Sequence, residues 1–192
     1  STTAIHALDA VQFLAGSPYR RAQIHFGEIP GIRESRSNLH ISAECESGVW
    51  INIHIQPMAG FLSETFSVHG VGSSLKAHLF GPGGSRSSGR LVRWEADIEK
   101  SVFTDERFSH GERLGIDGEI AAFCEALREG IAPTPTLQEA RFPVRLMEAI
   151  RNREDQPIIL EQPQGSGSKE WRMTPHFLPV SGPLIRMVNP RG

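Results

Sequence analysis

Hydrophobic positions along the chain follow a helical spacing, then a strand spacing, then a helical spacing again. Residues 3–15 have apolar side chains at helical intervals between a threonine cap and Gly16, which predicts an amphipathic helix. From residue 19 to about residue 100, apolar and polar side chains alternate, which predicts antiparallel strands with one apolar face. The strands expected there are 39–45, 49–56, 63–69, 74–80 and 90–98, with Ser47-Gly48 as a tight hairpin between the first two.

Helical spacing returns after residue 116. Asp117 is placed to cap a helix that ends at Gly130, and the apolar stripe of this helix is expected to cover the sheet. The residues of that stripe are Ile120, Phe123, Cys124 and Leu127.

A further helix and a short strand complete the pattern. Thr136 and Glu139 have the spacing of a capping box, which predicts the start of a helix that reaches Ile150. Residues 158–160 are apolar and stand between prolines, which favours a strand at a sheet edge. The order of elements is typical of an α+β domain: an open, mostly antiparallel β-sheet with helices packed on one face.

The end of the chain has a different composition. Residues 162–192 are rich in proline and glycine and show no period, yet they contain Trp171, Phe177 and other large apolar side chains. Because this is too apolar for a disordered linker, we expect an extended arm laid along its own subunit or a neighbour. Residues 1–161 are expected to form the α+β domain.

Charge and composition exclude several classes of protein. A net charge of −2 with scattered Lys and Arg leaves no basic stripe, so nucleic acid is not an expected partner. No apolar run approaches the ~20 residues of a membrane helix, and the start does not resemble a signal peptide. These observations favour a soluble, cytoplasmic protein. Cys45 and Cys124 both fall in apolar phases and are interpreted as small core residues rather than a disulfide.

Some segments imitate known motifs. Gly70-Val71-Gly72 lacks the third glycine of a dinucleotide fingerprint and leads into a strand, so it is interpreted as a turn. Residues 81–85 lack the lysine of a phosphate loop and are interpreted as a hairpin tip. His40, His54 and His78 leave open a metal hydrolase on the sheet face, although their spacing is not that of close ligands.

Two residues of the first helix are candidates for catalysis. His6 and Asp9 are three apart and share one helical face, so the carboxylate is placed to orient the imidazole and stabilise its charge. A histidine held in this way is suited to moving protons near neutral pH. A packed or solvated histidine without a catalytic role has the same sequence signature.

Several segments resemble one family. Residues 5–16, from Ile5-His6-Ala7-Leu8-Asp9 to Gly16, are similar to the helix that opens the C-terminal domain of the glucose–fructose oxidoreductase, inositol dehydrogenase and rhizopine-catabolism (Gfo/Idh/MocA) family. Residues 66–75 resemble a strand-turn-strand of that domain, and residues 119–130 and 137–150 resemble its last two helices. Together these segments cover residues 5–160 in the family's order.

The resemblance implies a division of labour between two domains. In the family an N-terminal Rossmann domain holds NAD or NADP, and we expect that domain to be absent from this chain, which alone should be inactive. His6 then matches the proton-transfer residue, Asp9 the acidic residue after it, and Phe61 an aromatic residue near the substrate. Thr2 and Ala4 stand where many members have aspartate and glycine.

The sequence therefore predicts the catalytic and oligomerisation domain of an NAD(P)-dependent oxidoreductase acting on a sugar, a cyclitol or a related hydroxylated small molecule. The alternative is a non-enzymatic binding or assembly domain of the same fold. A homodimer or homotetramer is expected to form through the outer sheet face. The residues expected on this face are His40, Ser42, Trp50, Asn52, His54 and Gln56.

Overall fold

The computed structural model describes residues 3–32, 37–60, 63–80, 89–104, 108–113, 115–133 and 135–160. The predicted arm at 162–192 and the glycine-rich tip at 81–85 lie outside the described residues.

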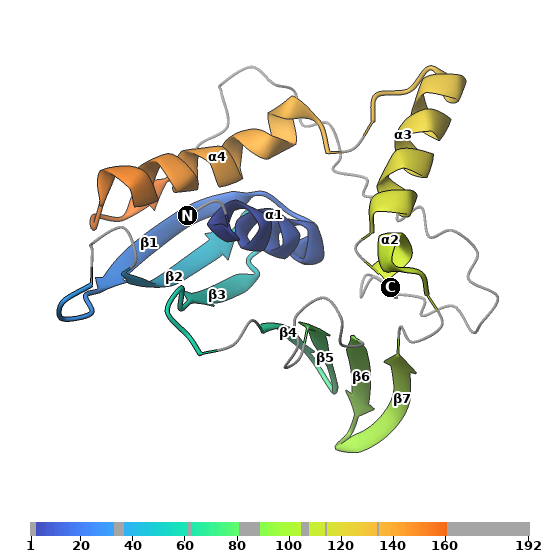
Figure 1. Ribbon diagram of the computed structural model, residues 1–192, viewed down its shortest axis with the longest axis horizontal. Coiled ribbons are helices and arrows are strands. Elements are labelled where there is room, and N and C mark those ends of the chain that lie inside the picture. The colour runs from blue at the N-terminus through green and yellow to red at the C-terminus, as the bar shows by residue number, and fades with distance from the viewer. Residues whose placement is uncertain are drawn as a thin grey trace.

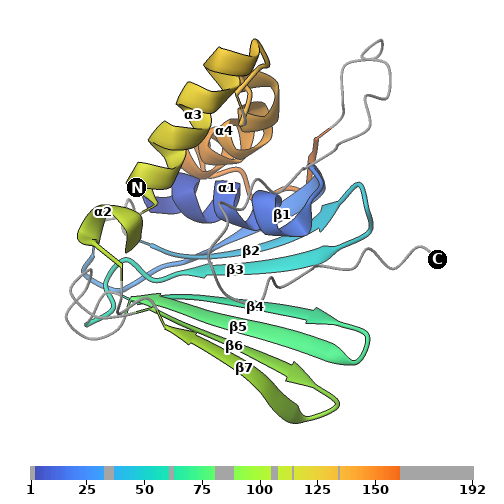
Figure 2. The same ribbon diagram turned by 90° about the vertical axis from the view of Figure 1, so that its right-hand side faces the viewer.

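The first of two antiparallel sheets is covered by helices on one face. Its strand order is β3-β2-β1-β8, and α1 and α4 lie against the same side of it (Figures 1 and 2). The helices are α1 (Thr3–Ala15) and α4 (Leu137–Asn152). The strands are β1 (Tyr19–Gly27), β2 (Asn38–Cys45), β3 (Trp50–Ile55) and β8 (Ile158–Ile159).

The core of the molecule lies between this sheet and these two helices. Ile24, Ile41 and Ile53 form one row across β1, β2 and β3 and are buried. Leu8 of α1 and Leu146 of α4 are completely buried against the same cluster. Strand alternation sends every second side chain into this core and leaves the others on the opposite face.

The second sheet has the strand order β4-β5-β6-β7, and its edge strand β4 lies next to β3 of the first sheet (Figure 2). A single strand over 90–98 was the prediction, and it is wrong, because a hairpin turns at Ala96 and Asp97. Both turn residues have positive φ, 47° and 64°, as a two-residue hairpin turn requires, although neither is glycine. The strands are β4 (Glu64–Gly70), β5 (Ser73–Phe80), β6 (Arg90–Glu95) and β7 (Ile98–Thr104).

The helix α3 (Ile116–Glu129) differs from expectation in three ways. Its apolar stripe does not cover a sheet: Ile116, Ile120, Phe123 and Leu127 are 46–62% exposed. Cys124, predicted to be a core residue, is exposed, whereas Cys45 is buried as predicted. Asp117 is not the cap: the N-cap is Gly115, two residues earlier, and no side chain makes a capping hydrogen bond there. The short helix α2 (His110–Arg113) precedes it.

Several local predictions are confirmed. Gly16 ends α1 with a φ of 62°, and Gly48 turns the β2–β3 hairpin with a φ of 83°. The short strand β8 lies at the sheet edge beside β1. The α+β class with open antiparallel sheets is confirmed, and the strands divide into two sheets rather than one. In the part of the chain that the structure describes, no helix combines the length and apolar character needed to cross a bilayer.

Candidate functional site

The first helix presents His6 to solvent because its opposite side is fixed in the core. Ala4 and Leu8 are one turn apart and completely buried, which sets the rotation of α1 on the sheet. His6 lies between them in sequence and is therefore exposed, whereas Asp9 is half-buried. The structure thus places an accessible imidazole one helical turn before a partly desolvated carboxyl group.

The electrostatic environment of Asp9 has three contributions. Partial burial raises the pKa of the Asp9 carboxyl, because the charged form loses hydration. The neighbouring His6, when charged, lowers this pKa, and the Glu139 carboxylate raises it, with a net upward shift. The Asp9 carboxyl therefore lies within electrostatic range of His6, on its own helix, and of Glu139 of α4.

The start of α4 is capped and hydrogen-bonded to α1. The Glu139 backbone N–H donates to the Thr136 hydroxyl at 3.3 Å, and the Thr136 N–H donates to Glu139 Oε2 at 2.5 Å. This is the capping box predicted from the sequence. Gln12 of α1 donates from Nε2 to the Glu139 carbonyl oxygen at 3.1 Å, joining residues 127 positions apart.

Gln12 is the polar residue of this region that sequence reasoning missed. It is buried, and its Oε1 has no hydrogen-bond partner among the described residues. Its signal in the sequence was its position three residues after Asp9, on the turn that continues from His6 and Asp9. Glu139 was identified only as a capping residue, since its closeness to Asp9 depends on how α1 and α4 pack.

Two further titratable groups close to the core stay protonated at neutral pH. The Tyr19 hydroxyl donates to the Leu8 carbonyl oxygen at 2.6 Å, and burial raises the pKa of Tyr19 strongly. Burial, with the nearby carboxylates Glu46 and Glu44, raises the pKa of the Cys45 thiol to about 11. Neither side chain is therefore suited to proton transfer, and both serve the packing beneath α1.

The remaining sequence candidates that the structure describes do not join this site. Phe61 lies outside the described residues. His40 and His54 are adjacent on the outer face of the first sheet, whereas His78 belongs to β5 of the second sheet. Among the described residues, no three His, Cys, Asp or Glu side chains come together as a metal site would need.

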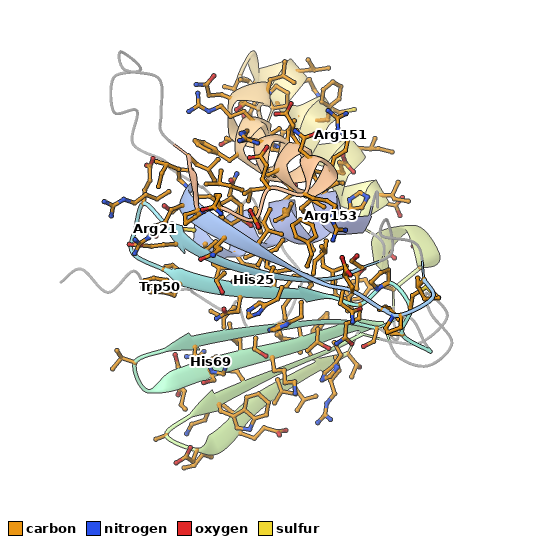
Figure 3. All side chains as sticks on the ribbon, turned by 90° about the vertical axis from the view of Figure 1, so that its left-hand side faces the viewer. Arg21, His25, Trp50, His69, Arg151 and Arg153 are labelled. Atoms are coloured by element: carbon orange, nitrogen blue, oxygen red, sulfur yellow. The ribbon has the colours of Figure 1, made fainter. Side chains whose placement is uncertain are left out.

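The face of the first sheet that lies opposite α1 and α4 forms a second polar surface, which we call the outer face. The pairing of β1, β2 and β3 places His25, His40 and His54 in one row, then Gln23, Ser42 and Asn52, then Arg21, Glu44 and Trp50. The Arg21 guanidinium lies 5.4 Å from the Trp50 ring centroid, and its Nε donates to Glu44 at 2.6 Å. Figure 3 looks onto this face, with Arg21, His25 and Trp50 labelled.

Comparison with known proteins identifies the fold. No model of a known protein family matches the sequence, and no curated protein matches it either. The aldose-aldose oxidoreductase from Caulobacter crescentus is similar in structure, with a TM-score of 0.62 and 14% identity over 82% of this chain and 46% of that one. An oxidoreductase from Agrobacterium radiobacter, solved with NAD+, L-tartaric acid and magnesium, gives a TM-score of 0.60 and 11% identity over 81% of this chain and 47% of that one.

A regulatory protein has the same fold. The transcriptional regulator Gal80p from Kluyveromyces lactis gives a TM-score of 0.56 and 18% identity over 83% of this chain and 46% of that one. The chain therefore spans about half the length of the solved structures it matches. At these identities the likeness establishes the fold and not the activity. The chain has the fold of the C-terminal half of Gfo/Idh/MocA-type oxidoreductases, which Gal80p shares.

Proposed function

We propose that this chain is the substrate-binding, proton-transferring half of an NAD- or NADP-dependent oxidoreductase that acts on a sugar, a cyclitol or a related hydroxylated compound. The observation that carries the proposal is the exposed His6 beside the half-buried Asp9, on the helix that opens this fold. The similar structures include an aldose-aldose oxidoreductase and an oxidoreductase bound to NAD+, which supports the assignment of class.

The cofactor is assigned to a Rossmann domain outside these residues. A dinucleotide needs a glycine-rich turn from a strand into a helix, whose free amides receive the pyrophosphate. Gly70-Val71-Gly72 joins β4 to β5 instead, so it does not fit this group. When held by such a domain, the nicotinamide supplies the hydride acceptor.

His6 has one task in this scheme. Its imidazole accepts the proton of the substrate hydroxyl while the carbon that bears this hydroxyl loses a hydride and becomes a carbonyl carbon. The Asp9 carboxylate stabilises the resulting imidazolium. Gln12 and the capped start of α4 hold α1 in place behind these two residues. The protein thereby positions the base on a fixed helix rather than on a loop.

An activity screen tests this function. The full-length protein, including whatever sequence precedes Ser1, is incubated with NAD+ or NADP+ and a panel of aldoses, polyols and cyclitols. Formation of reduced nicotinamide, followed by its absorbance, is the expected result. No reduction with any member of the panel would contradict the proposal.

That negative result would favour the alternative, a non-enzymatic binding domain. Gal80p, a regulator, shares the fold, and Thr2 and Ala4 replace residues common in the enzymes that this chain resembles. Tight binding of a sugar without its oxidation would be the positive sign of this second function.

We further propose that two copies of the chain pair through the outer face. Trp50 is 66% exposed and lies against Arg21, and these two residue types are enriched where interfaces gain most of their binding energy. The polar rows beside them suit a two-fold pairing in which the same surface meets itself. Light scattering at micromolar concentration should give the mass of a dimer or tetramer, and Trp50→Ala should shift it towards the monomer. A wild-type protein that is monomeric at that concentration would contradict the pairing.

A further inference from the structure

Three histidines stand side by side on the outer face. His25 pairs with His40 across β1 and β2, and His40 pairs with His54 across β2 and β3. The ring centroids of His40 and His54 are 4.3 Å apart with an interplanar angle of 22°, a stacked arrangement. The His25 and His40 centroids are 5.9 Å apart. We call these three residues the histidine row.

The histidine row lies at the surface, where water reaches it. His25 and His54 are exposed and His40 is half-buried, with its Nε2 3.5 Å from the Ser42 hydroxyl. The helices α1 and α4 cover the opposite face of the sheet. In the free chain the row is therefore in contact with water, which screens any charge on it.

Among the residues that the structure describes, no carboxylate is paired with the histidine row. On the described part of these strands, Glu44 is the one carboxylate in the rows that face outward, four residues along β2 from His40. Glu44 is already held by Arg21 at 2.6 Å and Arg20 at 3.6 Å. β3 adds only uncharged side chains besides its histidine to this face.

The neighbouring sheet adds basic, titratable and acidic groups. One face of β4 and β5 has Thr65 opposite His78, Ser67 opposite Lys76 and His69 opposite Ser74. The same face continues to Arg90 of β6 and Glu99 of β7, which form an ion pair at 4.0 Å, so this carboxylate is held by a base of its own sheet rather than by the histidine row.

We propose that the histidine row is a pH gate on the pairing of two copies through the outer face. This inference rests on the proposed pairing. Neutral imidazoles stack, and a second copy can cover them without an electrostatic penalty, whereas imidazolium ions at this spacing repel one another. Covering the face removes the water that screens the repulsion, and a two-fold pairing brings in a second row. Protonated copies therefore separate.

The test is the dissociation constant of the paired protein, measured by sedimentation equilibrium at about pH 8 and about pH 5.5, on either side of the range in which imidazoles titrate. We expect at least about tenfold weaker association at the lower pH, a change of the size that a modest electrostatic penalty produces. Circular dichroism at both pH values checks that the chain stays folded.

Two variants connect the effect to the histidine row. His54→Gln changes an exposed side chain, and the double variant His40→Gln, His54→Gln removes the stacked pair; each should reduce the pH dependence, the double variant more. His69→Gln is the matched control, because it removes an exposed histidine from β4 instead. It should retain the pH dependence of the wild type.

The outcomes separate the gate from the pairing. Equal dissociation constants at both pH values would overturn the gate and leave the pairing intact, as would a double variant that keeps the full pH dependence. A protein that is monomeric even at about pH 8 would overturn the pairing and the gate with it. Neither result bears on the redox activity proposed for His6.

Discussion

Asp9 is a residue whose charge the fold disfavours at neutral pH. The folded chain holds the Asp9 proton more tightly than the unfolded chain, where the carboxyl has its ordinary pKa of 3.8. The stabilisation from this proton is complete below that pKa and is lost as the pH rises through the raised value. A half-buried carboxylate that costs stability is consistent with a residue kept for chemistry.

We therefore predict that Asp9→Asn raises the free energy of unfolding at neutral pH, because it removes a partly desolvated charge. The gain should shrink as the pH falls towards the ordinary pKa of aspartate, since the wild-type carboxyl is then protonated as well. Urea unfolding at several pH values measures it. In the oxidoreductase the same variant should slow the redox step less than loss of His6 does, because Asp9 acts through His6.

The control for this prediction is Asp155→Asn, the same change at an exposed residue after α4. It should show no comparable pH-dependent gain. An Asp9→Asn protein that is less stable than the wild type at neutral pH would mean that the Asp9 carboxylate is held by a stabilising partner.

At the scale of single elements, the capping box fixes the start of α4. It thereby also fixes the Glu139 carbonyl oxygen, which accepts the hydrogen bond from Gln12. Thr136→Ala removes the hydroxyl that accepts from the Glu139 N–H and should lower the free energy of unfolding by about 1 kcal/mol. Thr136→Ser keeps the hydroxyl and should be close to wild type. Denaturant unfolding of both variants measures the difference, and equal stability of the two would show that the box contributes nothing.

The helix α3 gives a matched comparison of one substitution at two sites. Leu146→Ala in α4 empties a completely buried position and should cost about 2–5 kcal/mol. Leu127→Ala in α3 shortens a side chain that is 62% exposed and should change stability by no more than about 0.5 kcal/mol. Similar costs at the two sites, measured by denaturant unfolding, would mean that a surface covers the α3 stripe in solution.

At the scale of the whole molecule, local signals in the sequence predicted local structure well. Gly16, the Ser47-Gly48 hairpin and the Thr136–Glu139 box each specify a helix end or a turn within a few residues, and the structure confirms all three. The turn at Ala96 and Asp97 was missed because neither residue is a glycine, although both have positive φ. Tight hairpins are recognised in a sequence by glycine at the turn, and this turn contains none.

Long-range arrangement was harder to predict for a physical reason. Periodicity shows which side of a helix is apolar but not what that side meets, so the exposed stripe of α3 and the division into two sheets were not foreseen. The same applies to the site. His6 and Asp9 follow from spacing on one helix, whereas Gln12 and Glu139 meet through the packing of α1 on α4.

The measurement that tests the central claim most directly is the rate of nicotinamide reduction in a single turnover by the full-length protein with His6→Ala. The matched control is His69→Ala, the same change at an exposed histidine of β4. Because a proton-transfer group acts in the transition state, we predict a loss of about 10²–10⁴-fold in this rate, with the affinity for NAD or NADP unchanged. The control should keep the wild-type rate. An unchanged rate in His6→Ala, or an equal loss in both variants, would contradict the account.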